Sequence, residues 1–106
     1  MMTIYEALAE PMRRKILDFI RERPRTVGEL VELLQISQPG VSKHLRILRE
    51  VELVRVRPQS QRHYYELAPA PLREIDNWLA AYRHHWSENF ERLDELLIKL
   101  QDDKKE

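Results

Sequence analysis

The polar residues best suited to chemistry gather in one short segment, residues 37–49. They are Ser37, Gln38, Ser42, Lys43, His44, Arg46 and Arg49, with Gly40 among them. Hydroxyl, amide, ammonium and imidazole groups can bond to the edges of DNA bases, and guanidinium groups bind phosphates. Gly40 has no side chain, so the backbone there can approach a ligand closely. The segment therefore suits nucleic-acid binding, although a polar helix face considered alone is more often simply solvated.

The rest of the chain offers little for catalysis. Its 106 residues include two glycines and no cysteine. Two glycines cannot form a phosphate-binding P-loop or the three-glycine turn of a dinucleotide site. Without cysteine there is no disulfide, thiolate metal site or cysteine nucleophile. No spacing of serine, histidine and aspartate suggests a catalytic triad. We expect neither an enzyme nor a cofactor.

Three short helices are expected ahead of the polar segment. Apolar residues recur at helical spacing over residues 4–20, but Pro11 interrupts them, so a first helix ends just before Pro11 and a second begins there. Pro24 ends the second helix. Thr26 and Glu29 have the spacing of a capping box, in which each side chain bonds to the backbone N–H of the other. This pair predicts the start of a third helix, about two turns long.

A fourth helix, residues 37–51, carries the polar segment. Ser37 can cap it, and Pro39 is tolerated in a first turn whose N–H groups have no partner within the helix. At about 100° per residue the apolar residues share one face, and two basic residues lie nearly opposite. The buried face consists of Val41, Leu45 and Leu48, and the basic residues are Lys43 and Arg46.

A β-hairpin is expected after the fourth helix, over residues 54–67. Apolar and basic residues alternate over 53–57, strand formers recur over 62–67, and residues 58–61 suit the turn between them. Helices followed by such a hairpin predict a mainly α fold with a β-hairpin wing, a winged helix-turn-helix. In this fold a short helix and a tight turn let the next helix enter a DNA major groove. Together these features favour DNA binding over a merely solvated face.

The last part of the sequence predicts one long helix, about residues 70–101 and roughly 45 Å in length. Its apolar residues step by three or four: Leu72, Ile75, Leu79, Tyr82, Trp86, Phe90, Leu93, Leu97 and Leu100. A core built from the preceding residues is too small to cover this stripe, so we expect much of it to contact another chain. Its aromatic residues, with Trp78, either pack in that contact or line a pocket for an apolar effector. We expect residues 1–101 to form one domain and 102–106 to be a disordered charged tail.

Charge is unevenly distributed along a chain whose formal net charge is zero. Residues 37–63 contain six basic and two acidic residues, a net charge of +4, whereas residues 69–106 contain six basic and nine acidic residues, a net charge of −3. The start of the chain lacks the pattern of a signal peptide, and no apolar run approaches the length of a membrane span. We expect a soluble cytoplasmic protein with no membrane partner.

Four segments, in the same order, are similar to those of the ArsR/SmtB family of bacterial transcriptional repressors. They are YEALAEPMRRKIL over 5–17, TVGEL over 26–30, SQPGVSKHLRILRE over 37–50 and RHYYEL over 62–67. The resemblance spans nearly the whole chain and is most specific in the third segment. Within the family, the chain is most similar to the metal-independent branch related to the sporulation-delay autorepressors.

This resemblance implies a homodimer that binds an inverted-repeat operator in double-stranded DNA and blocks transcription. The implied base-contacting residues are Ser37, Gln38, Ser42, Lys43 and His44, with Arg62 in the wing, and Gly40 and Arg46 complete the expected DNA contacts. The first and last helices would form the dimer interface. Its expected residues are Ile4, Tyr5, Leu8, Trp78, Leu79, Tyr82, Trp86, Phe90 and Leu93.

Two positions depart from the family pattern. The expected wing turn, residues 58–61, has no glycine, which disfavours insertion of the wing into a minor groove. Glu52 occupies the place where the fourth helix commonly ends at a glycine.

Metal sensing, common among relatives, is not expected. The positions that match the thiolate site on the third helix are Val31 and Leu33, which cannot bind a metal. On the last helix only His85 and Glu88 match the zinc ligands, fewer than the three or four that zinc requires. We expect His84 and His85 to pair with Glu88 at helical spacing instead.

Two other functions compete with DNA binding. A winged-helix module could bind another protein through its long helix, and it would then be a monomer indifferent to DNA. A small hydrolase would need a nucleophile and a pocket, and the sequence suggests neither.

Overall fold

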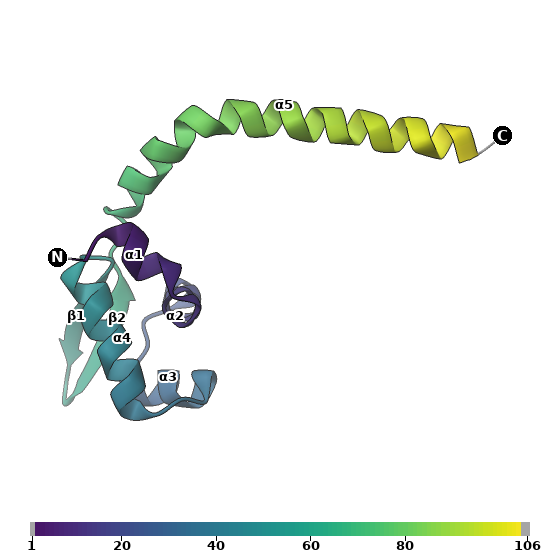
Figure 1. The fold of residues 1–106 in the computed structure, drawn as a ribbon. Helices are drawn as coiled ribbons and strands as arrows, with labels where there is room; N and C mark the ends of the chain where they lie inside the picture. The colour runs from purple at the N-terminus through teal and green to yellow at the C-terminus, as the bar shows by residue number, and fades with distance from the viewer. Residues whose placement is uncertain (1, 105–106) are drawn as a thin grey trace. The chain divides into compact units, whose positions relative to one another are not determined.

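The computed structural model describes residues 2–104, which form five helices and one two-stranded antiparallel sheet (Figure 1). The elements are α1 (Ile4–Ala9), α2 (Pro11–Glu22), α3 (Val27–Leu34), α4 (Gln38–Glu50), β1 (Val54–Gln59), β2 (Arg62–Leu67) and α5 (Leu72–Lys104). This order confirms the expected winged helix-turn-helix. The chain divides into two units, one ending at Leu72 and one beginning at Arg73.

The break between α1 and α2 is at Glu10 and Pro11, as expected. Glu10 has an extended backbone and ends α1, and its carboxylate accepts a hydrogen bond from the Met12 N–H at 3.1 Å and so caps α2. Pro11 fits the first turn of α2, where its missing N–H has no partner to lose. Arg13 and Arg14 of α2 donate to carbonyl oxygens of α1, so the two helices are tied together at this corner.

Side-chain caps start α3 and α4 at the expected residues. Both bonds of the capping box are present: the Glu29 N–H donates to Thr26 Oγ1 at 3.2 Å, and the Thr26 N–H donates to the Glu29 carboxylate at 3.4 Å. Ser37 caps α4 by accepting from the Gly40 N–H at 3.2 Å. Between the two helices, Gln35 adopts a left-handed backbone with φ 57°. The chain therefore reverses within three residues and starts α4 directly.

The end of α4 explains how Glu52 replaces the glycine expected there. Glu52 has a left-handed backbone with φ 63°, and its N–H donates to the Arg49 carbonyl at 2.9 Å. The next N–H, that of Leu53, donates to the Leu48 carbonyl at 3.0 Å, which completes a Schellman motif. Leu48 and Leu53 are both fully buried in the same core. These two hydrogen bonds and this apolar contact offset the roughly 1–2 kcal/mol that a left-handed residue with a Cβ costs.

The first strand of the hairpin is longer, and the turn tighter, than the sequence suggested. Val54 pairs with Leu67 and Gln59 with Arg62, so the turn consists of Ser60 and Gln61 alone rather than residues 58–61. Ser60 supplies the positive φ, 57°, that such a turn requires. Pro58 is tolerated inside β1 because a two-stranded sheet consists of edge strands.

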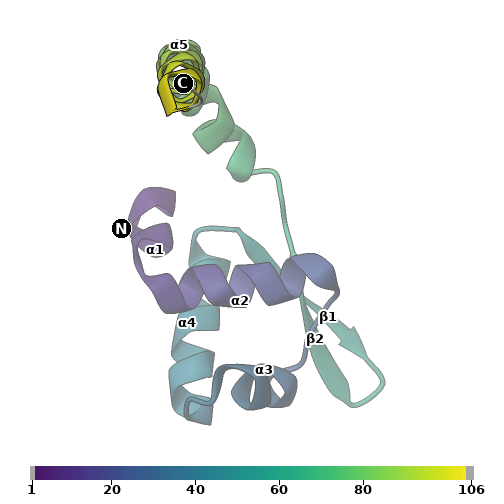
Figure 2. The same cartoon turned by 90° about the vertical axis from the view of Figure 1, so that its right-hand side faces the viewer.

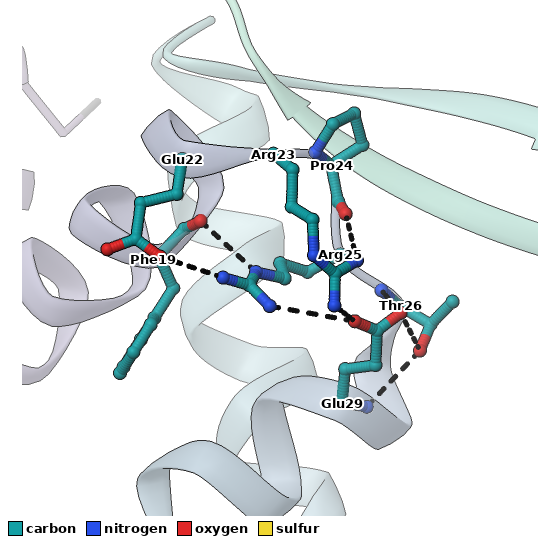
Figure 3. A network of polar contacts seen from close by, with 7 residues as sticks. All are labelled: Phe19, Glu22, Arg23, Pro24, Arg25, Thr26 and Glu29. Atoms are coloured by element: carbon teal, nitrogen blue, oxygen red, sulfur yellow. Dashed lines mark hydrogen bonds and ion pairs between the residues drawn. The ribbon is translucent and has the colours of Figure 1, made fainter.

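Arg25 joins the hairpin to the helices, as Figure 3 shows for its side chain. The backbone N–H of Arg25 donates to the Tyr65 carbonyl at 3.0 Å, and the Tyr65 N–H donates to the Arg25 carbonyl at 2.7 Å. Arg25 thus forms an isolated antiparallel β-bridge with β2. Its guanidinium donates to the Phe19 carbonyl at 3.2 Å and to Glu22 at 3.0 Å, and lies 3.8 Å from Glu29. Arg25 is 8% exposed. This buried cation fixes the junction of α2, α3 and β2.

The core lies within the first unit. Its buried side chains come from α2, α3, α4 and the start of the hairpin: Ile16, Ile20, Leu30, Val41, Leu45, Leu48, Leu53 and Val54. The three residues expected on the inner face of α4 are all among them. The core holds α4 from one side, which leaves its opposite side exposed.

The second unit is the helix α5, which runs to Lys104. It begins two residues later than expected and continues three residues past the expected end at residue 101. Residues 102–104 are therefore helical rather than part of a disordered tail, and 105–106 lie outside the described residues. None of the helices among residues 2–104 combines the length and the apolar character needed to cross a membrane.

Candidate nucleic-acid interface

The beginning of α4 and the turn of the hairpin lie at the same end of the first unit. Both views show them at its lower end, with α3 beside the start of α4 (Figures 1 and 2). The core fixes α4, and the pairing of Arg25 with Tyr65 fixes β2. Polar groups on α4 and on the wing are therefore displayed by rigid elements rather than by loops.

Most of the expected DNA contacts are exposed at this end. The exposed ones are Ser37, Gln38, Ser42, Lys43, Arg46 and Arg62, whereas Gly40 and His44 are half-buried. Arg46 lies 3.9 Å from Glu50, one helical turn away, in an exposed ion pair that contributes little stability. The side chains of Gln38, Ser42 and Lys43 make no hydrogen bond or ion pair with any other described residue. Their polar groups are therefore available to a ligand.

Ser37 and Gly40 together form the cap of α4, and the sequence predicted only the part played by Ser37. The Ser37 hydroxyl oxygen accepts the Gly40 N–H, which leaves its own O–H to donate elsewhere. A Cβ on Gly40 would lie 3.2 Å from this oxygen and 3.7 Å from Ile36 Cδ1, the first of which is a tight contact. The absence of a side chain at Gly40 therefore allows the hydrogen bond that caps α4 to form. It also leaves room for DNA to approach the backbone closely.

His44 faces α2 as well as solvent. The Arg13 guanidinium lies within hydrogen-bond distance of the ring, with 3.4 Å between Arg13 Nη1 and His44 Nδ1. Burial and the positive charges of Arg13 and Lys43 lower the pKa of His44, and Glu10 opposes them. These surroundings therefore favour the neutral form of the imidazole. The sequence could not reveal this contact, because the two residues are far apart in the chain.

The outer face of the wing carries two further arginines that the sequence analysis did not select. Arg55 donates to Glu66 at 2.8 Å, directly across the hairpin, and Arg57 lies 3.8 Å from the same carboxylate. The alternation of apolar and basic residues in β1 was the available signal, since it places both arginines on the exposed face. Arg62 sits at the turn, where it pairs with Gln59 in the strand register.

The expected dimer residues of α5 are largely exposed. The exposed fractions of Trp78, Tyr82, Trp86, Phe90 and Leu93 lie between 48% and 63%. At about 100° per residue, the large apolar side chains from Leu72 to Leu100, with the exception of Ile98, fall within an arc of roughly 120°. In α1, Tyr5 is 43% exposed, and Ile4 and Leu8 are half-buried. The helix α5 thus presents a continuous apolar stripe that is largely exposed.

Within the described residues, the histidines of α5 belong to no metal cluster, and one of them pairs with a glutamate. His84 Nε2 lies 3.0 Å from the Glu88 carboxylate, one of the two pairings expected there. Among residues that the structure describes, no three or more histidine, aspartate or glutamate side chains gather as a metal site would require. Val31 and Leu33 of α3 carry no ligating atoms.

Comparisons with known proteins agree with this geometry. Residues 10–56 match the family model described as "Bacterial regulatory protein, arsR family". The chain is 35% identical over 79 residues to the transcriptional repressor SdpR of Bacillus subtilis, an alignment that covers 74% of this chain and 88% of that protein. It is similar to the crystal structure of an ArsR family transcriptional regulator, with a TM-score of 0.68, 28% identity and coverage of 79% and 87%.

A third similarity concerns the fold alone. The solution structure of a homodimeric winged helix-turn-helix DNA-binding domain from Mycobacterium bovis matches with a TM-score of 0.61 and 24% identity, and the match covers 76% of each chain. It confirms that the arrangement of α1–α4 and the hairpin is that of a winged helix-turn-helix.

Proposed function

The chain belongs to the ArsR family of bacterial regulatory proteins and is a transcriptional regulator, and we propose that it is a repressor that binds an inverted-repeat operator as a homodimer. One observation carries this proposal: the start of α4 displays polar side chains without intramolecular partners at the same end of the unit as the wing. A repressor is the role that the name of the Bacillus relative indicates.

We assign base contacts to the start of α4 and phosphate contacts to its flanks and to the wing. Gln38, Ser42 and Lys43 would contact base edges in the major groove, because they are exposed and have no internal hydrogen bond to break. Arg46 and Arg62 would bind phosphates. Ser37 would contribute its O–H while its oxygen caps the helix.

Dimerisation follows from the uncovered stripe on α5. A helix of 33 residues with a continuous apolar face is not a stable solvated element on its own, because its large side chains remain half-exposed. We propose that a second copy covers this face and that Ile4, Tyr5 and Leu8 of α1 also take part in dimerisation. Two α4 helices about 34 Å apart could then contact successive major grooves.

The DNA contacts are tested by selecting bound duplexes from a random pool and measuring affinity at several salt concentrations. Wild-type affinity should fall steeply with salt, because each neutralised phosphate releases counterions. Lys43→Ala should weaken binding at least tenfold, whereas Lys15→Ala, which removes an exposed lysine of α2, should change affinity less than twofold. If no duplex is retained at low salt, the proposed function is wrong.

The dimer is tested by sedimentation of two matched variants. Trp86→Asp places a charge in the middle of the apolar stripe and should yield monomers, whereas Ala80→Asp lies roughly 140° away from the centre of the stripe and should leave the dimer intact. The monomeric variant should also lose operator affinity. Wild-type protein that is a monomer and ignores DNA would instead favour the module that binds another protein.

We also propose that this regulator acts in the cytoplasm, where its operator would be. We further propose that zinc does not control its binding to DNA. The described residues supply a paired His84 and Glu88 but no further ligand beside them. Addition of zinc or of a chelator should therefore leave operator affinity unchanged. A zinc-dependent loss of binding that disappears in His85→Ala would contradict this.

A further inference from the structure

The side chain of Arg13 links two helices that the proposed function uses in different ways. Its Nε donates to the Ala7 carbonyl at 2.6 Å and its Nη2 to the Glu6 carbonyl at 3.3 Å, both in the last turn of α1. Its Nη1 lies 3.4 Å from Nδ1 of His44, in the middle of α4. The two carbonyls hold the guanidinium plane in place, so that Nη1 lies next to the histidine ring.

This contact determines where the proton of His44 resides. A guanidinium has only donors, so Nδ1 must accept, and the proton of the neutral ring must be on Nε2. Nε2 makes no hydrogen bond within the described residues, yet it is not among their buried polar atoms without a partner. It therefore reaches solvent as an N–H donor.

The surroundings of the ring favour this neutral form. Burial lowers the pKa of His44 most, the charge of Arg13 on α2 and that of Lys43 on α4 lower it further, and Glu10 at the start of α2 raises it. Protonation of Nδ1 would also place an N–H opposite the Arg13 donors. The contact between Arg13 of α2 and His44 of α4 thus disfavours protonation of the ring.

We propose that Arg13 is a positioning residue for DNA recognition: it holds His44 neutral and oriented, so that Nε2–H acts as a directed hydrogen-bond donor to a base. This inference rests on the proposed function. The acceptors it would suit in a major groove are guanine O6 or N7, adenine N7 and thymine O4. A charged, mobile imidazole would instead be attracted to any phosphate and would add affinity without sequence preference.

The first arm of the test uses the protein without DNA. In wild-type protein, long-range proton–nitrogen NMR should show His44 as the Nε2–H form, and its titration should lie at a lower pH than in Arg13→Met. Arg14→Met is the matched control, because Arg14 also donates to α1, at 2.7 Å to the Leu8 carbonyl, but does not contact His44. A wild-type ring protonated at Nδ1, or an unchanged titration in Arg13→Met, overturns the proposal.

The second arm uses the selected duplex and its single-base-pair variants. Arg13→Met should reduce discrimination at one position of the half-site about three- to tenfold, and its affinity for all duplexes should rise as the pH falls below that of the His44 titration. Arg14→Met should keep wild-type discrimination. His44→Ala should lose the same discrimination, and the double variant with Arg13→Met should lose no more.

The outcomes separate three explanations. Losses that multiply in the double variant, or that Arg14→Met shares, would mean that Arg13 acts by anchoring α1, and the proposal is overturned. Unchanged discrimination in Arg13→Met overturns it as well. If wild-type protein retains no duplex at all, the proposed function fails, and the proposed role of Arg13 in DNA recognition fails with it. The NMR arm would then still establish whether Arg13 fixes the state of the ring.

Discussion

Arg25 provides the sharpest test of how this fold is held together, because its neighbour Arg23 is a natural control. Both guanidinium groups pair with Glu29, Arg23 at 2.8 Å and Arg25 at 3.8 Å. The Arg23 side chain is 57% exposed, however, and that of Arg25 only 10%. If the distance to Glu29 alone determined stability, loss of the Arg23 guanidinium would lower the free energy of unfolding more. If burial and the number of satisfied partners determine it, loss of the Arg25 guanidinium will lower it more.

Arg25→Met keeps the aliphatic stem and deletes only the charged group. The largest loss is the charge-assisted bond to the Phe19 carbonyl, worth about 1.5–3 kcal/mol. Glu22 is 62% exposed and can be hydrated again, and Glu29 retains Arg23 and the Thr26 N–H, so the 3–5 kcal/mol typical of a broken buried pair is not reached. We expect a loss of about 2 kcal/mol.

Arg23→Met should cost less than about 1 kcal/mol, as exposed ion pairs do. Urea unfolding followed by circular dichroism measures both variants, at one fixed protein concentration because association contributes to apparent stability. With a slope of about 1–2 kcal/mol per molar urea, the midpoint of Arg25→Met should fall by roughly 1–2 M. Equal losses in the two variants, or a loss below about 0.5 kcal/mol for Arg25→Met, would refute the reasoning.

Three further substitutions test the packing of the core, the end of α4 and the dependence of stability on acid pH. Leu48→Ala, at a fully buried position, should cost about 3–4 kcal/mol in urea unfolding, and Leu33→Ala, at a position 42% exposed, less than about 1 kcal/mol. Glu52→Gly should raise the free energy of unfolding by about 0.5–1 kcal/mol by relieving its left-handed backbone, whereas Glu50→Gly, at the last residue of α4, should lower it by up to a similar amount. Burial raises the pKa of Glu29, but hydrogen bonds from Thr26 and Arg23 outweigh it, and the net value lies below 4.5. This carboxylate therefore stabilises the fold above that pH, and acid unfolding below about pH 4.5 should be shallower in Glu29→Gln.

Local signals predicted the elements that position the interface. Pro11 and the pair Thr26 and Glu29 located helix boundaries because proline and side-chain caps act within a few residues of the chain. The stripe of α5 was evident for a similar reason, since a helix repeats its faces regularly. The hairpin was predicted with too long a turn, because the sequence does not show that Ser60 tolerates a left-handed backbone.

The contacts that were missed all depend on the assembled tertiary structure. Glu52 replaces a glycine only because Leu53 is buried against Leu48, which requires the core to exist first. Arg55 is exposed beside Glu66 because the register of the hairpin brings them together. His44 was expected to contact a base, but nothing in the segment around it indicates that Arg13 occupies its other nitrogen.

Internal partners decide which polar groups remain for DNA, and this distinguishes α4 from the wing. The side chains of Gln38, Ser42 and Lys43 have no hydrogen bond or ion pair with the described residues, so binding through them breaks no contact of the fold. Arg55 and Arg57 share Glu66 instead, and a phosphate would have to compete with that carboxylate for them. The positive charge of Lys43 is therefore fully available on the helix, whereas that of Arg55 and Arg57 is partly neutralised on the wing. Sequence discrimination and most of the salt dependence should accordingly arise at α4, with the wing contributing chiefly through Arg62 at its turn.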